Sequence, residues 1–219
     1  MTDQDELLHR TSLEEAVQAL RRDLLAEGGP RISTMRNYRF AILPYRPVDE
    51  FKLRKLIRRL SDDLKAEGWS VLSISLQKLL LDRIRSSGDQ EVRRLIDRER
   101  KLFQKGPGLG GPERALDDLR QTIAQHVEGP SGIAADVIKL IDGFAEAAPE
   151  DADRTLVLLG RAGALYPFFR SSALLKHIDG KTRNIPVVLL YPGERRDTTA
   201  LSFMGELPSD RDYRPRIYP

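Results

Sequence analysis

The hydrophobic pattern is clearest in the last third of the chain. Two short apolar runs, at 155–160 and 186–193, show no polar alternation, and a helix-length segment separates them. Unbroken runs of this kind are typical of strands that are buried on both faces, as in a parallel sheet. The stretch 155–193 therefore predicts a strand–helix–strand unit whose helix runs through His177.

A second unit of this kind is predicted upstream. Residues 38–43 form an apolar strand that Pro44 ends, and residues 69–75 alternate between apolar and polar positions. Between them, Asp49 can cap a long helix that ends before Gly68. The predicted buried stripe of this helix consists of Phe51, Leu53, Leu56, Ile57, Leu60 and Leu64.

The N-terminal and middle segments have helical patterns. Residues 12–28 begin with a capping box, in which Ser12 precedes Glu15 by three positions. Residues 86–148 contain several charged or amphipathic helical segments that glycine–proline pairs interrupt. Because two strands precede these segments and two follow, we expect 86–148 to be a helical insertion.

These elements predict a single α/β domain over 1–219, with an open, mainly parallel sheet of four or five strands flanked by helices. The proline-rich tail, 207–219, has no period and is expected to lie extended over the body. After the first strand, Pro44 and Pro47 remove two amides that a phosphate-binding loop would need. The fold thus resembles a nucleotide-binding domain without a phosphate loop, and the chain contains no Walker-type motif.

Composition is that of a soluble globular protein, with 40% hydrophobic and 32% charged residues. The 36 basic and 33 acidic residues nearly balance, which is not typical of a nucleic-acid-binding domain. Because cysteine is absent, disulfides and cysteine nucleophiles are excluded, in agreement with a reducing cytoplasm. The acidic N-terminus does not resemble a secretory signal, and no apolar run reaches the ~18 residues of a membrane span. We expect a cytoplasmic protein that makes no membrane contact.

No complete catalytic set emerges from the sequence. Gly106, Gly108 and Gly111 have the spacing of a dinucleotide-binding motif, but they follow a charged helix and not a strand, which favours a linker. The three histidines lie far apart, without further ligands at metal spacing. Ser171 and Ser172 fall inside a predicted helix, where no strained turn would expose a nucleophile. We therefore expect a protein that is not an enzyme and that holds no cofactor or metal.

Two groups of basic residues are candidate binding sites. The first, on the polar face of the helix after Asp49, is here called the basic ridge: Lys52, Arg54, Lys55, Arg58 and Arg59. It is interpreted as a solvated face or as a docking patch for an acidic partner. The phosphates of DNA are an alternative ligand, although no aromatic residues are interleaved with the basic ones.

The second group is a candidate site for an anion or a partner: Arg161, Arg170, Tyr191 and Arg195. Arg161 and Arg195 follow strands, whose carboxyl ends bind ligands in open α/β sheets. Arg170 is predicted in the first turn of a helix that Pro167 opens, where the helix N-terminus would also attract an anion. In the alternative interpretation, Arg170 ties the loops together by donating hydrogen bonds to carbonyl groups.

The segments around these residues resemble one family, BrxB, the small protein of bacteriophage exclusion (BREX) defence systems. The C-terminal signature of the family is similar to 156–163 (LVLLGRAG), 165–175 (LYPFFRSSALL) and 186–193 (PVVLLYPG). Residues 38–46 and 212–217 also look like that family, so the resemblance spans most of 12–218. It implies no catalytic residue.

The resemblance also implies a bacterial cytoplasmic protein that helps to distinguish self from phage DNA within a multi-protein system. Other proteins of such systems are a large AAA-type ATPase, an alkaline-phosphatase-like protein of the PglZ type and an adenine methyltransferase. We expect a non-catalytic adaptor or scaffold in antiviral defence that links the ATPase and the phosphatase-like protein, with at most indirect DNA association. Two alternatives remain open: a degenerate domain that senses a nucleotide or phosphate through Arg161 and Arg170, and an accessory protein that binds DNA non-specifically through the basic ridge.

Overall fold

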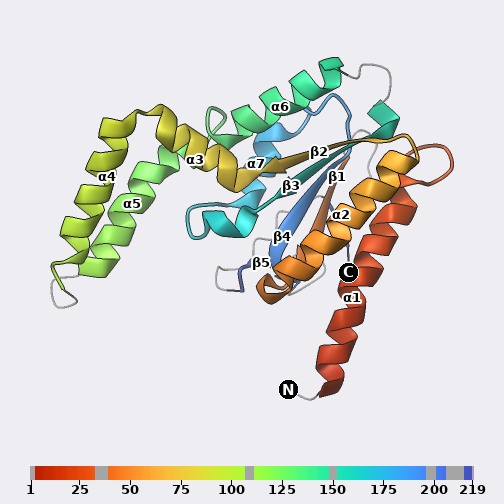
Figure 1. The fold of residues 1–219 in the computed structure, drawn as a ribbon, viewed down its shortest axis with the longest axis horizontal. Coiled ribbons are helices and arrows are strands. Elements are labelled where there is room, and N and C mark those ends of the chain that lie inside the picture. Colours follow the sequence, from red (N-terminus) through yellow and green to blue (C-terminus); the bar gives the residue numbers. More distant parts are fainter. Residues whose placement is uncertain are drawn as a thin grey trace.

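The computed structural model describes residues 3–32, 39–106, 111–147, 152–195, 201–205 and 215–218 (Figure 1). For residues 3–12, 152 and 195 only the backbone is described. A central sheet lies between two layers of helices, and two further helices stand away from these layers (Figure 1).

The central sheet is mainly parallel. Its strands are β1 (Phe40–Tyr45), β2 (Ser70–Ser75), β3 (Thr155–Gly160), β4 (Val187–Arg195), β5 (Leu201–Phe203) and β6 (Arg216–Ile217). The order β2-β3-β4-β1-β6 contains parallel pairs alone, whereas β5 pairs antiparallel with the end of β4. The α/β fold is therefore confirmed, and β5 and β6 are the strands that the hydrophobic pattern did not predict. The strands of the predicted upstream unit, β1 and β2, are not neighbours, because β4 and β3 lie between them.

The strands β1, β3 and β4 are buried on both faces of the sheet, which explains their unbroken apolar runs. Along β3, Leu156 and Leu158 join one core, and Val157 and Leu159 join the other. The first core lies under α1 (Asp3–Leu24) and α2 (Glu50–Ala66). The second lies under α3 (Leu76–Ser86), α6 (Ile133–Ala147) and α7 (Ser171–Ile178) (Figure 1). Successive side chains of a strand point to opposite faces. A strand between two helical layers therefore needs apolar residues at both its odd and its even positions.

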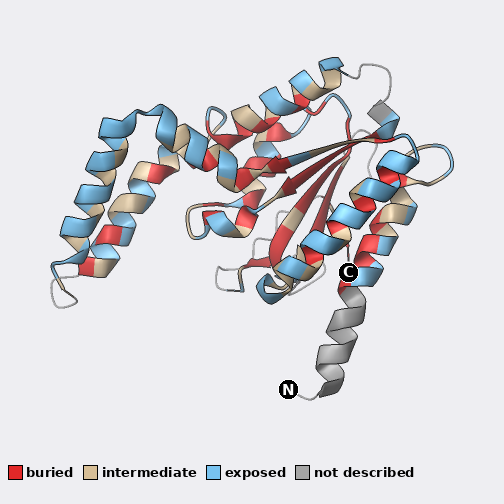
Figure 2. Cartoon of the chain, viewed as in Figure 1, coloured by how far each residue is buried: buried red, intermediate tan, exposed pale blue. Residues whose placement is uncertain are grey.

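Two helices of the expected insertion form a hairpin that projects from the body. α4 (Asp89–Phe103) and α5 (Gly111–Val127) pack against each other, and the last turns of α5 bury Ile123 and Val127 in the core beside the sheet (Figure 2). No residue of α4 is buried. In contrast, α6 buries Ile133, Val137 and Ile141 in the core next to the sheet. The segment 86–148 thus contains both a projecting hairpin and a helix of the sheet layers.

Two predicted boundaries are wrong. The N-terminal helix spans Asp3–Leu24 and not 12–28. β1 also continues through Pro44 to Tyr45. The carbonyl group of Ile42 accepts a hydrogen bond from the backbone N–H of Tyr218. Alternate residues of a strand direct their backbone groups to the same neighbour, so those of Ile42 and Pro44 both point toward β6. Because the described pairing with β6 ends at Ile42, the missing N–H of Pro44 breaks no hydrogen bond of that ladder.

The end of the chain forms an edge strand, which the sequence did not predict. Most of the tail expected at 207–219 lies outside the described residues, but β6 pairs with β1. Tyr218 is only 1% exposed, and its hydroxyl group donates a hydrogen bond to Asp23 Oδ2 of α1 at 2.8 Å. Arg216 Nη2 lies 2.7 Å from the same oxygen. Burial, together with the hydrogen bond to Asp23, raises the pKa of Tyr218. The end of the chain therefore connects α1 to the edge of the sheet.

The packing of Tyr218 predicts a large effect of its removal. Tyr218→Ala is expected to lower the free energy of unfolding by ~3–5 kcal/mol, as for other buried aromatic residues, and Tyr218→Phe by ~1 kcal/mol for the lost hydrogen bond. Urea denaturation followed by circular dichroism measures both. Phe103→Ala is the control, because Phe103 is 57% exposed and its removal should cost less than ~0.5 kcal/mol. Equal stability of Tyr218→Ala and the control would contradict the packing of the tail.

Candidate functional site

The carboxyl ends of β1, β3 and β4 meet at one edge of the sheet, because these strands are parallel neighbours. A cavity of about 230 Å³ lies at this edge. Its walls include Tyr45, Pro47, Glu50, Arg161, Pro192 and Met204. Open α/β sheets bind ligands outside the carboxyl ends of their strands, which makes this cavity the candidate site.

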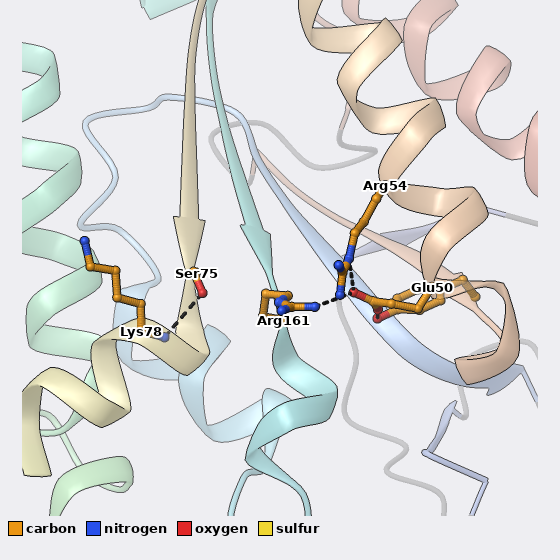
Figure 3. A network of polar contacts seen from close by, with 6 residues as sticks. Glu50, Arg54, Ser75, Lys78 and Arg161 are labelled. Carbon is orange, nitrogen blue, oxygen red and sulfur yellow. Dashed lines mark hydrogen bonds and ion pairs between the residues drawn. The ribbon is translucent and has the colours of Figure 1, made fainter.

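Glu50 stands at the centre of a set of polar contacts beside the cavity (Figure 3). Its Oε1 accepts hydrogen bonds from Arg54 Nε at 2.9 Å and from Arg161 Nη1 at 3.3 Å. The hydroxyl group of Tyr45 donates to the other oxygen, Oε2. These four residues are called the Glu50 cluster below. With two guanidinium groups and one carboxylate, the cluster carries an excess of one positive charge.

Local backbone structure brings the cluster together. After β1, a short 3-10 helix at Pro47–Asp49 leads into α2, so Glu50 lies in the first turn of that helix. After β3, Arg161 adopts a left-handed conformation with a φ of 64°, which turns the chain into a second 3-10 helix at Ala162–Leu165. The turn and the start of α2 thus place a guanidinium group and a carboxylate from distant parts of the sequence in contact.

The predicted side-chain cap of α2 is absent. Asp49 precedes the helix, but its side chain makes no capping hydrogen bond. Its carboxylate instead accepts a hydrogen bond from Arg46 Nε at 2.9 Å. Glu50 places a negative charge in the first turn, where the helix dipole favours it.

The environment of Tyr45 keeps its phenol group neutral. Burial is the main cause that raises the pKa of Tyr45 above its ordinary value of 10.0, and the hydrogen bond to Glu50 and the charge of Glu50 act in the same direction. The positive charge of Arg54 acts in the opposite direction and is the smallest of these effects. Tyr45 therefore acts as a hydrogen-bond donor to Glu50 throughout the neutral pH range.

The structure does not gather the predicted anion-binding group in one cavity. Arg161 lines the cavity at the sheet edge, whereas Arg170 lines a separate cavity of about 40 Å³ beside α7. Tyr191 is buried, and its hydroxyl group donates to the carbonyl group of Leu201 at 3.3 Å. Arg195 ends β4, and its side chain is outside the described part of the structure. An anion site that uses Arg161 or Arg170 stays a proposal.

The helix that carries His177 begins later than predicted. α7 starts at Ser171, so Pro167 does not open it and Arg170 is the residue before its first turn. Phe169 is 2% exposed and its ring lies 6.0 Å from that of Phe203, centroid to centroid. This packing holds the segment before Ser171 against the core. His177 does lie in the last turn, as expected.

Two residues of the basic ridge, Lys52 and Arg54, form ion pairs within the protein. Lys52 Nζ lies 2.9 Å from Glu14 Oε2 of α1, and Arg54 belongs to the Glu50 cluster. Lys55, Arg58 and Arg59 are exposed and form no ion pair with any residue that the structure describes. The outer part of the ridge is therefore available to a partner.

The prediction that Phe51 belongs to the buried stripe of α2 is wrong. Phe51 is 74% exposed, whereas Leu53, Ile57 and Leu60 are buried. Nine positions, or about 2.5 helical turns, separate Phe51 from Leu60, so the two residues lie on opposite sides of the helix. A helical wheel of the sequence would have shown this. Nearby Val48 is 80% exposed.

Within the described ranges, neither a metal-binding cluster nor a membrane-spanning helix is present. Among those residues, no group of three or more His, Asp or Glu side chains could hold a metal ion. Likewise, none of the described helices is long and apolar enough to span a membrane. Gly108, in the middle of the glycine motif, lies outside the described residues.

The raised pKa of Tyr45 predicts a loss of stability in alkaline solution. In the unfolded chain Tyr45 ionises near 10.0, whereas in the folded protein it stays neutral to higher pH. The free energy of unfolding should therefore be constant with respect to this group below pH 10 and should fall as the pH rises further. Tyr45→Phe should flatten this decline, as measured by urea denaturation between pH 8 and about 11. A decline equally steep in Tyr45→Phe would contradict the assignment.

Neutralising Glu50 should destabilise the protein moderately. Glu50→Gln preserves the shape of the side chain but removes the carboxylate with which Arg54 and Arg161 pair in the described part of the chain. Because both guanidinium groups are partly exposed, we expect a loss of ~1 kcal/mol in the free energy of unfolding at neutral pH. Glu91→Gln is the matched control, since Glu91 pairs only with the exposed Arg94 among the described residues, at 2.8 Å. Equal losses in the two variants would show that the cluster has no special role in stability.

One family model matches the chain, that of BREX protein BrxB, over residues 72–217. This range includes most of β2, the strands β3 to β6 and the projecting hairpin. No curated protein and no solved structure matches the chain. Since the match covers more than half of its residues, the protein belongs to the BrxB family and is a component of BREX defence against phage.

Proposed function

We propose that this protein is a non-catalytic adaptor of its BREX system that links the large AAA-type ATPase and the alkaline-phosphatase-like component. The observation that carries the proposal is the Glu50 cluster. At the sheet edge where related architectures bind ligands, the chain places its own carboxylate between Arg54 and Arg161. This arrangement supports a stabilising role for these charges instead of a role in turnover.

The hydrogen bonds of Glu50 make the binding of an anionic ligand at this edge less favourable. An anion that approached Arg161 would compete with Glu50 Oε1, which already lies 3.3 Å from Arg161 Nη1. Pro44 near the end of β1 and Pro47 at the start of the following 3-10 helix supply no amide hydrogen to a phosphate. Both features favour protein partners over a bound nucleotide.

The arrangement of exposed elements suits a protein that contacts two partners. The α4–α5 hairpin projects at one end of the longest axis of the molecule, and α1 and α2 lie toward the other end (Figure 1). Two partners could therefore bind these regions without overlap. The hairpin also exposes apolar side chains, since Ile96, Phe103 and Leu116 are each more than 40% exposed.

A second candidate function, phosphate or nucleotide sensing, has one observation in its favour. Arg161 lines the cavity of about 230 Å³, and its side chain is 41% exposed. A ligand at a hundredfold excess over its dissociation constant would stabilise the fold by about 2.7 kcal/mol and raise the melting temperature. If nucleotides cause no such shift, or if Arg161→Ala retains it, this second function is excluded.

Co-purification tests the adaptor function directly. We expect the tagged protein, expressed with its genomic neighbours, to elute in size-exclusion chromatography together with the ATPase, the phosphatase-like protein or both. The tag belongs at the N-terminus, because Tyr218 near the other end is buried. The measurement is the composition of the eluted complex by gel electrophoresis and mass spectrometry. Elution of the protein without either component would refute the proposal.

A further inference from the structure

The 3-10 helix before α2 and the first turn of α2 each expose one large apolar side chain. Val48 is 80% exposed and Phe51 is 74% exposed. Single exposed apolar residues are common on protein surfaces, but a pair beside exposed Pro47 forms a small apolar patch next to the candidate cavity. Val48 and Phe51 are called the apolar pair below.

Exposed basic residues follow the apolar pair along α2. Phe51, Lys55 and Arg58 are spaced i, i+4 and i+7, which places them on one face of the helix. Lys55, Arg58 and Arg59 are exposed and have no ion pair among the residues that the structure describes. Phe51 and these cations therefore lie on the exposed side of α2, and Val48 lies in the 3-10 helix that precedes it.

Contacts with the Glu50 cluster restrict the ring of Phe51. The Arg54 guanidinium carbon lies 5.1 Å from the centre of that ring, and Arg54 Nε also donates to Glu50 at 2.9 Å. An aromatic side chain that is held before binding loses less conformational entropy when a partner covers it. Aromatic and arginine residues are also those that contribute most to protein–protein affinity.

The charges of Lys55, Arg58 and Arg59 are not neutralised by an ion pair among the described residues. Lys55 lies in the second turn of α2 and is exposed. Arg58 and Arg59 follow in the next turn, on the side away from the core. An external negative charge would compensate these side chains.

We propose that the apolar pair together with Lys55, Arg58 and Arg59 is a docking surface for an acidic protein segment that carries apolar side chains. The inference rests on the proposed adaptor function, because it names the chemistry of one partner. A nucleic acid fits this surface less well. Val48 offers no ring for base stacking, and the guanidinium group of Arg54 lies over the ring of Phe51.

The proposal is tested with variants of each of the two parts of the surface. Their affinity is measured for the BREX component that the wild-type protein binds. Phe51→Ala removes the aromatic anchor, and Lys55→Glu/Arg58→Glu reverses two free charges. Each should weaken binding to the ATPase or the phosphatase-like protein at least tenfold, and wild-type affinity should fall with added salt. The substituted side chains are exposed, so the variants should fold, as urea denaturation will show.

Matched controls lie on the projecting hairpin. Phe103→Ala removes an aromatic residue that is 57% exposed, and Arg93→Glu/Arg100→Glu reverses two exposed charges of α4. These controls should bind the same component with affinity within about twofold of that of the wild type, well below the tenfold loss expected of a central contact. Equal losses in the α2 and the hairpin variants would overturn the assignment of the surface.

The outcomes separate this inference from the adaptor function. If the wild-type protein binds a BREX component and the α2 variants bind it equally well, the docking surface is wrong and the adaptor function stands. If the wild-type protein binds neither component, both are wrong. If the α2 variants lose affinity only for labelled duplex DNA, measured in parallel by fluorescence anisotropy, the surface binds nucleic acid and the proposal of an acidic protein segment is overturned.

Discussion

Burial of the central strands on both faces is the constraint on which the rest of the structure depends. β1 and β3 contain no charged residue, and β4 contains none before Glu194, so each strand needs an apolar layer above and below. α1 and α2 supply one layer, and α3, α6 and α7 supply the other. Removal of apolar surface from water is the dominant favourable contribution to folding, at about 25 cal/mol per Å². The positions of the helices, and of the loops at the sheet edge, follow from this requirement.

The same topology concentrates charge at one edge of the sheet. Because the central strands are parallel, the ends of β1 and β3 bring the start of α2 and the turn at Arg161 into contact. Two guanidinium groups near each other need a counter-charge, and Glu50 provides it from within the chain. In many α/β proteins a bound anion would have that role. Here the carboxylate of Glu50 connects the turn after β3 to the first turns of α2.

α2 therefore packs one face against the core and exposes the other to solvent. Its inner face buries Leu53, Leu60 and Leu64 against the sheet, which makes the helix a rigid element. Its outer face carries Phe51 and a row of basic residues, and Arg54 links that face to the Glu50 cluster. A rigid helix that presents an aromatic residue and free charges suits a protein that works within a multi-protein defence system.

The sequence by itself determined the fold class, because the unbroken apolar runs at β3 and β4 occur where a strand is buried on both faces. It also located the basic residues of α2. Only the tertiary structure decided which of these charges are free, since Glu14 and Lys52 pair across two helices and Arg161 meets Glu50 across 111 positions. The edge strand β6 was likewise unpredictable, because two residues carry no periodic signal and gain their structure from pairing with β1. Local patterns record which side chains avoid water, whereas contacts between distant residues depend on the packing of the complete chain.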